Sequence, residues 1–312
     1  MNLYSSLFQF INQMFKSSGT ATASASASAS ASATASENTS PSPNSGNGNV
    51  LTIKTVQIAP MRTLLTALKD ILLESNITFC PDGIRIINMD KSHTMLAHMF
   101  LAAENFEEYD CQKEKIIIGV NMFHLFKLVN TIDNDDTLTI YIENKDYNEG
   151  IVSFLGLKFE NGDIKQCKTQ KLRLIEPEPE ELIEPNVVFS SVINLPSADF
   201  QKIIRDLSFI SDKLEIKSVG NELIFKCSGQ FATAEVTRVE TSGSMEFIHK
   251  QNANKIIQGE FSLKNLGYFI KCTNLCSQIE MYLENDLPLV VKYYVASLGE
   301  IKLCLAPLPS SN

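Results

Sequence analysis

The chain has no tryptophan, only four histidines and an aromatic content of 8%. Proteins that bind single-stranded nucleic acid stack bases on aromatic side chains, and no such platform accompanies the basic residues here. No run approaches the roughly 20 continuous apolar residues that a membrane-spanning helix needs, so we expect no membrane partner. These absences disfavour a single-strand binder and a membrane protein.

The chain also lacks recognisable catalytic and metal-binding motifs. It has no nucleophile elbow, Walker loop or dinucleotide fingerprint. Asp90, Ser92 and His93 lie close together, but no second catalytic cluster accompanies them. Cys272 and Cys276 could share one helix turn, yet no further pair of ligands lies near them in sequence. We therefore predict that the protein is not an enzyme and holds no metal and no cofactor.

The seven cysteines are an odd number, scattered mostly through apolar segments. This usage is typical of reduced, buried thiols and therefore indicates an intracellular compartment.

The first 49 residues are unlike the rest of the chain. Residues 17–49 consist almost entirely of small and polar residues, which predicts a disordered tether. Residues 3–15 before it are apolar but interrupted by polar side chains, and no basic residue precedes them. A secretory signal would need a charged start and an unbroken apolar middle. An inert extension and a short amphipathic docking peptide remain open.

Positive charge is concentrated on four stretches with helical apolar spacing, although the formal net charge is -9. Spacings of three and seven residues place each basic pair on one helix face. Such a distribution creates a local field for a polyanion, and a DNA duplex is the obvious candidate. Ordinary solvated helix faces are the alternative. The candidate DNA-binding residues are Arg62, Lys69, Lys127, Lys202, Arg205, Lys264 and Lys271.

The pattern repeats, and a strand-like run with a glycine precedes the second and fourth helical stretches, at Gly119 and Gly259. This repeat predicts two similar halves with two helices each. Most of the remaining sequence alternates with period two, as in antiparallel strands, including one strand over residues 109–118. We expect an α+β fold with the helices on one face of the sheets. Residues 174–189, with three prolines and five glutamates among residues 174–185, predict an extended connector. The predicted domains are therefore residues 50–173 and 190–309.

Six short motifs, in order, carry a family resemblance between residues 50 and 309. They are VQ at 56–57 with ALKD at 67–70, NMDKSH at 88–93, IGVN at 118–121, RDLS at 205–208, PLVV at 288–291 and LAP at 305–307. The chain resembles the proliferating cell nuclear antigen sliding clamps of eukaryotes, archaea and large DNA viruses.

The resemblance implies a ring of three identical subunits that encircles duplex DNA and tethers a polymerase. In the family the helices line the hole, and the seven basic residues match positions that face DNA. The resemblance implies that a strand near residues 169–174 pairs with the strand at 233–239 of the next subunit. A clamp loader is implied as a second partner, with a nucleus or a viral replication compartment as the location.

The resemblance also implies a groove beneath the connector that receives short peptides of partner proteins. Matching positions are Met89, His93, Leu96, Leu182, Pro288, Ala306 and Pro307. Thr94, Glu184 and Cys304 depart from the usual aliphatic or aromatic residues, which suggests an altered peptide preference. Two alternatives share parts of this pattern, namely a checkpoint-type clamp subunit and a viral processivity factor that does not encircle DNA. Stoichiometry distinguishes them.

Overall fold

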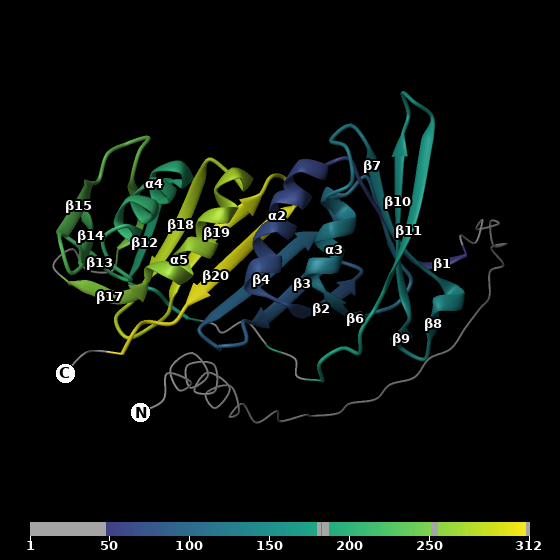
Figure 1. Cartoon of the computed structure of the whole chain (residues 1–312), viewed down its shortest axis with the longest axis horizontal. Coiled ribbons are helices and arrows are strands. Elements are labelled where there is room, and N and C mark those ends of the chain that lie inside the picture. Colours follow the sequence, from purple (N-terminus) through teal and green to yellow (C-terminus); the bar gives the residue numbers. More distant parts are fainter. Residues whose placement is uncertain (1–47, 180–181, 183–186, 251–254, 310–312) are drawn as a thin grey trace, which may run out of the picture.

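The computed structural model describes residues 48–179, 182, 187–250 and 255–309. Residues 1–47 of the predicted extension, and Glu184 in the connector, lie outside these ranges. The described chain forms two halves that lie side by side along the long axis (Figure 1). None of its helices combines the length and the apolar character that crossing a bilayer requires.

The first half begins with a strand, a helix and a three-stranded meander, and ends with a second helix and further strands. Its elements are β1 (Asn49–Thr55), α2 (Ile58–Ile71), β2 (Glu74–Cys80), β3 (Gly83–Met89), β4 (Met95–Ala102), η2 (Ala103–Asn105), β5 (Glu108–Cys111), β6 (Ile116–Asn121), α3 (Met122–Val129), β7 (Thr137–Glu143), η3 (Asn144–Asp146), β8 (Tyr147–Asn148), β9 (Ile151–Val152), β10 (Phe154–Asn161) and β11 (Gln166–Arg173).

The second half repeats this order with few changes. Its elements are β12 (Ser191–Pro196), α4 (Ser197–Ser208), β13 (Lys213–Val219), β14 (Glu222–Ser228), β15 (Thr233–Val239), β16 (Glu246–Lys250), β17 (Ile257–Ser262), α5 (Leu263–Phe269), η4 (Ile270–Leu275), β18 (Gln278–Leu283), β19 (Leu289–Val295) and β20 (Gly299–Leu305).

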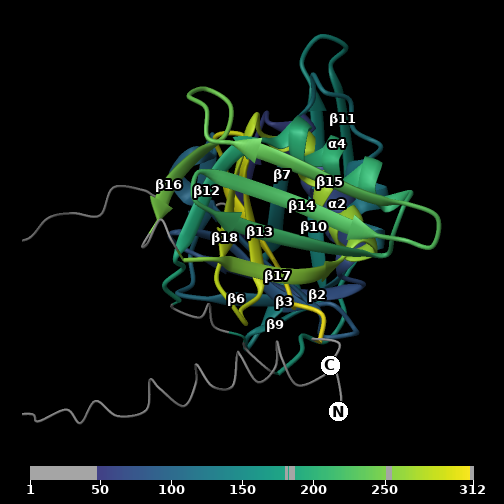
Figure 2. The same ribbon diagram turned by 90° about the vertical axis from the view of Figure 1, so that its left-hand side faces the viewer.

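Strand order shows the duplication directly. The order β11-β10-β7-β1-β5 in the first half matches β20-β19-β18-β12-β16 in the second, and β6-β2-β3-β4 matches β17-β13-β14-β15. Within the chain, β4 pairs antiparallel with β20, which joins the two halves in one nine-stranded sheet. The strand equivalent to β4 is β15, which ends the four-stranded sheet, and the strand equivalent to β20 is β11, which ends the five-stranded sheet. These two strands lie at opposite ends of the molecule (Figures 1 and 2).

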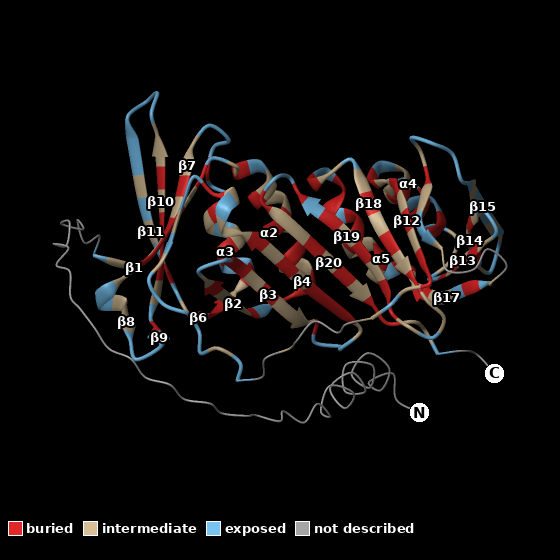
Figure 3. Ribbon diagram, turned by 180° about the vertical axis from the view of Figure 1, so that it is seen from behind, coloured by how far each residue is buried: buried red, intermediate tan, exposed pale blue. Residues whose placement is uncertain are grey.

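The junction between the halves is tight. Gly299 at the start of β20 lies opposite Leu101 of β4, and a Cβ at Gly299 would collide with the carbonyl oxygen of Phe100. The backbones approach this closely because glycine has no side chain at that point. The sheet therefore continues from one half into the other without a gap, as the view from behind shows (Figure 3).

The helices form one layer on one side of the nine-stranded sheet, as predicted (Figure 1). Helix α2 packs against α3, α5 and η4, and α4 packs against α5 and η4. Their apolar stripes are buried, for example Leu64 and Leu68 in α2 and Phe200 and Ile204 in α4. The side chains of Asn121 and Ser262 accept hydrogen bonds from the first turns of α3 and α5, which fixes where both helices begin.

Three local predictions were wrong. The strand expected over residues 109–118 is two strands, β5 and β6, which belong to different sheets because the polar segment 112–115 interrupts the alternation. Lys264 and Lys271 do not share one α-helix, since α5 ends at Phe269 and Lys271 lies on the 3-10 helix η4. Of the cysteines, Cys272 is buried, but Cys167 on the edge strand β11 is exposed.

Candidate nucleic-acid interface and partner groove

All seven basic residues predicted to bind DNA lie on the helix layer. Arg62 and Lys69 are on α2, Lys127 on α3, Lys202 and Arg205 on α4, Lys264 on α5 and Lys271 on η4. Arg62 and Lys69 are half-buried, and the other five are exposed. Among these, Lys127, Lys202, Arg205 and Lys264 form no ion pair with any residue that the structure describes. Their ammonium and guanidinium groups are available to an anion.

Arg62 has a structural role inside the layer. Its Nη1 donates to Oδ1 of Asn134 at 3.1 Å, and its Nη2 donates to the carbonyl oxygen of Ile132. Both partners lie in the segment between α3 and β7, so the guanidinium ties α2 to that segment. Arg62 therefore offers less of its hydrogen-bonding capacity to a ligand than the sequence suggests.

Asp70 links the basic residues of the two halves. Its Oδ1 accepts from Lys69 Nζ on α2 at 2.7 Å, and its Oδ2 pairs with Lys271 Nζ on η4. Burial alone would raise the pKa of Asp70, but the two lysine hydrogen bonds outweigh it and hold the pKa below its usual value. One carboxylate thus orients two ammonium groups and cancels one of their two charges. Sequence analysis missed this role of Asp70, although its position next to Lys69 in the last turn of α2 was visible.

A small apolar cluster on the other side of the molecule is separate from the main core. Leu96 of β4 and Ala306 after β20 are buried there, at 3% and 8% exposure. Ile87, Met89, Leu182 and Cys304 pack around them. The cluster therefore brings together side chains of the neighbouring strands β3 and β4, of the connector and of the end of β20.

Four of the seven residues predicted for the groove come together in this cluster, namely Met89, Leu96, Leu182 and Ala306. His93 is exposed on the turn before β4, with a positive φ of 53°, Pro288 is buried at the start of β19, and Pro307 is half-buried. Ile87 was not predicted, although its position two residues before Met89 on β3 places it on the same face. A hollow of about 290 Å³ continues from Ile87 and Leu182 toward β2 and β6.

The start of the connector is held against the first half by backbone and side-chain contacts. Ile175 forms a β-bridge with Gly119 of β6, where a Cβ on residue 119 would collide with the Ile175 carbonyl. Asn76 of β2 donates to the carbonyl of Glu178 at 2.7 Å and accepts from its backbone N–H at 2.9 Å. The described start of the connector therefore runs along the edge of the nine-stranded sheet.

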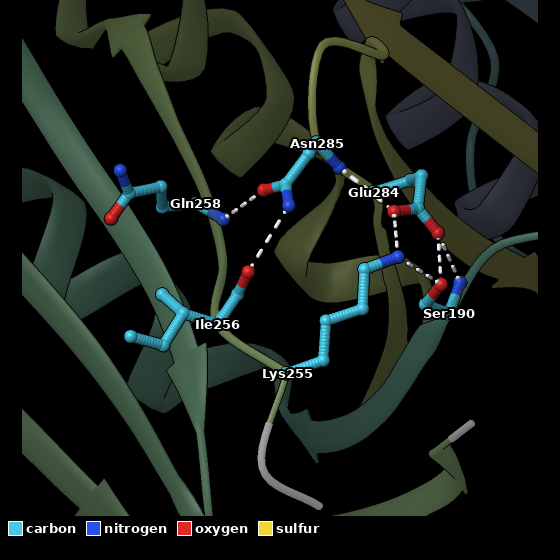
Figure 4. A network of polar contacts seen from close by, with 6 residues as sticks. All are labelled: Ser190, Lys255, Ile256, Gln258, Glu284 and Asn285. Carbon is cyan, nitrogen blue, oxygen red and sulfur yellow. Dashed lines mark hydrogen bonds and ion pairs between the residues drawn. The ribbon is translucent and has the colours of Figure 1, made fainter. Parts of the chain in front are cut away.

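A polar network fixes the chain just after the connector (Figure 4). The Glu284 carboxylate accepts from the backbone N–H of Ser190 at 2.9 Å, from the Ser190 hydroxyl, and from Lys255 Nζ at 2.7 Å. Asn285 next to it donates to the Ile256 carbonyl and accepts from the Gln258 N–H. The chain is therefore held by hydrogen bonds at Glu178 and again at Ser190, and Leu182 between them packs against the cluster of Leu96 and Ala306.

Asp90, which sequence analysis weighed as a catalytic candidate, organises a turn. Its carboxylate accepts the backbone N–H groups of Ser92, Thr94 and Met95 at 2.6–3.1 Å, and also the Ser92 hydroxyl. Asp90 is only 8% exposed, so these bonds occupy a largely buried group. The turn sets the start of β4, and with it the position of Leu96 in the groove.

Comparison with known proteins identifies the family. Residues 50–181 match the N-terminal domain of proliferating cell nuclear antigen, and residues 183–308 match its C-terminal domain. The chain belongs to the proliferating cell nuclear antigen family. Two viral relatives agree. The chain is 31% identical over 263 residues to the probable DNA polymerase sliding clamp 1 of Paramecium bursaria Chlorella virus 1, covering 83% of this chain and 97% of that protein.

The second relative is longer than this chain. The probable DNA polymerase sliding clamp of Acanthamoeba polyphaga mimivirus is 32% identical over 230 residues, which are 74% of this chain but 48% of that protein. The chain therefore aligns with about half of the mimivirus protein. Both family domains are present here in order, and together they account for the duplicated α+β clamp fold.

Proposed function

We propose that this chain is a DNA polymerase sliding clamp, a processivity factor that encircles duplex DNA as a ring of three identical subunits. The helix layer lines the hole, and the groove beneath the connector receives short peptides of the polymerase, the clamp loader and other replication and repair proteins. The protein acts at sites of DNA replication, in a nucleus or a viral replication compartment. It performs no bond chemistry of its own.

The two edge strands carry the ring proposal. β11 and β15 are the structural equivalents of β20 and β4, which already pair inside the chain. Pairing β11 of one subunit with β15 of the next repeats that junction between subunits and removes two exposed strand edges. Because the two surfaces differ and lie at opposite ends, the contact is head-to-tail, the type that closes into rings.

The basic layer supplies contacts suited to sliding. Lysine and arginine side chains bind phosphates independently of base sequence, and such contacts exchange as the clamp moves along the duplex. Enclosure by the ring, rather than affinity, then prevents dissociation. The whole chain has a formal net charge of -9 even with these basic residues included, so the rest of its surface repels DNA.

A processivity assay on primed circular DNA, with polymerase and loader, tests the proposal. We expect longer products with the clamp, and a loss of that effect when the circle is linearised so that a ring slides off its end. Replacing Lys202 and Arg205 on α4 with alanine should shorten the products. Lys226→Ala is the matched control, because Lys226 is an exposed lysine on β14 and not on the helix layer. This variant should leave the product length unchanged.

Stoichiometry separates the alternatives. Light scattering on the purified chain should give three subunits for the replicative clamp. A strict monomer that still supports synthesis on linear templates would instead indicate a factor that does not encircle DNA. A requirement for two different partner chains would indicate a checkpoint-type subunit.

A further inference from the structure

The segment at residues 3–15 has no place in the function proposed above. It contains no charged residue, and the first charge of the chain is Lys16. Five of its apolar residues are spaced four, three, one and three positions apart, which would place them on one face of a helix. They are Leu3, Leu7, Phe10, Ile11 and Met14. Such an apolar stripe is too short to span a membrane. Contact with an apolar protein surface would remove it from water, which is favourable.

The groove around Leu182 offers a surface of matching chemistry. Its cluster of Ile87, Met89, Leu96, Leu182 and Ala306 is apolar and separate from the main core. A hollow of about 290 Å³ continues from Ile87 and Leu182, and polar and charged side chains such as Thr78, Arg85 and Lys115 also line it. Docking of an amphipathic peptide by its apolar face onto an apolar groove is a common mode of peptide recognition.

The chain between segment and groove is long enough. Residues 16–47 are 32 residues, which span about 110 Å when extended and about 30 Å on average for a Ser- and Ala-rich chain. A folded part of this size has a radius of gyration of about 18 Å, so the segment reaches any surface of its own subunit. Tethering of this kind gives an effective concentration in the millimolar range.

We propose that residues 3–15 dock in the groove of their own clamp and compete there with the peptides of partner proteins. This inference rests on the proposed function of the groove. The segment acts as a tethered competitor, so that a partner must bind tightly enough to displace it. Weak or single-site partners are excluded, and the groove is shielded until a polymerase or loader arrives.

The test uses the full chain and a fluorescein-labelled synthetic peptide of residues 1–16 as the probe, with binding followed by fluorescence anisotropy. The chain carrying Phe10→Asp and Ile11→Asp cannot fill its own groove. It should therefore bind the probe roughly tenfold more tightly than the unchanged chain does, given a millimolar effective concentration and an intrinsic affinity near 0.1 mM. Equal affinity for the two chains would overturn the proposal.

Groove variants establish where the probe binds. In the chain carrying Phe10→Asp and Ile11→Asp, a further change of Leu182→Asp should abolish binding of the probe, and so should Met89→Lys made separately. Ile151→Asp on β9 is the control and should leave binding unchanged, because this side chain is 71% exposed and lies outside the cluster. Binding that survives both groove variants would place the segment elsewhere and refute this site. The proposed sliding-clamp function is tested separately. If the unchanged chain did not support processive synthesis, that function would be refuted, and the anisotropy result would still stand.

Discussion

At the scale of single residues, Asp70 decides how much positive charge the helix layer presents. It bridges Lys69 of the first half and Lys271 of the second. A phosphate that binds either lysine must compete with this carboxylate. The same carboxylate holds both ammonium groups in place, so their positions are set before any anion binds.

Asp70→Asn should therefore strengthen duplex binding. Removing the carboxylate frees about one unit of positive charge, so the slope of log K against log salt concentration should become more negative by about one. Anisotropy of a labelled duplex over a range of salt concentrations measures this slope. Asp206→Asn is the matched control, because Asp206 occupies the same position after Arg205 on α4 but is exposed and has no ion pair with a described residue. A slope unchanged in Asp70→Asn would show that the two lysines do not contact phosphates.

Glu284 provides a pH-dependent contribution to stability. Burial opposes its ionisation, but the hydrogen bonds from Lys255 and Ser190 prevail and hold the pKa of Glu284 below its usual 4.5. Because the pKa of Glu284 is lower in the folded than in the unfolded state, its ionised form stabilises the fold at pH values above the unfolded-state pKa. This contribution is lost as the pH falls through the folded-state pKa.

Glu284→Gln should consequently flatten the acid dependence of stability. Between about pH 5 and pH 3, the free energy of unfolding should fall less steeply in the variant than in the unchanged chain. Urea titrations at several pH values measure it. Glu108→Gln, on the exposed face of β5, is the control and should keep the original slope. Parallel pH profiles for all three chains would contradict the assigned role.

At the scale of secondary-structure elements, the internal β4–β20 junction predicts the register of the proposed junction between subunits. Inside the chain, Lys302 of β20 lies opposite His98 of β4. Thr169 of β11 corresponds to Lys302, and Glu235 of β15 corresponds to His98. Thr169 of one subunit should therefore lie opposite Glu235 of the next. The same correspondence sets Cys167 opposite Thr237. Both of these residues are exposed in the single subunit.

Thr237→Cys should therefore allow a covalent link between subunits. With a short bis-maleimide, Cys167 of one subunit and the new cysteine of the next should give cross-linked dimers and trimers on denaturing gels. Thr233→Cys, four residues away on the same strand face, should cross-link much less, and adding Cys167→Ser should abolish the product. Cross-linking of equal yield at both positions would refute this register.

At the scale of the whole molecule, the two family domains are not independent units. They share the nine-stranded sheet through β4 and β20, and α2 of the first half packs on α5 and η4 of the second. Hydrophobic cluster residues run continuously through both halves. Separating the halves would expose this shared interior, so they should unfold together.

Calorimetry should show one transition with equal calorimetric and van't Hoff enthalpies. Scans at several concentrations are needed, because dissociation of an oligomer shifts Tm with concentration. Gly299→Ala at the junction should lower Tm, since the added Cβ collides with the Phe100 carbonyl. Gly267→Ala on α5, where a Cβ meets nothing within 4 Å, should leave Tm unchanged or raise it. Two separate transitions in the unchanged chain would show that the halves are independent.

The elements themselves were largely predictable because they depend on local periodicity. The four helices followed from stripes such as Leu64, Leu65 and Leu68, and the repeat of two halves from the matching positions of Gly119 and Gly259 before α3 and α5. The split of residues 109–118 was missed because alternation does not reveal which sheet a strand joins. Local pattern also could not show that α5 gives way to a 3-10 helix before Lys271.

The sequence alone determined the family, the duplicated α+β plan and the concentration of basic residues on helices, since composition and short-range spacing encode all three. Only the tertiary structure decided which charges remain available, because the pairing of Asp70 with Lys271 joins residues 201 positions apart. It also decided that Leu96, Leu182 and Ala306 meet in one cluster and that β11 and β15 each form an edge of their sheet. Contacts over such separations depend on the packing of whole sheets, which no local pattern specifies.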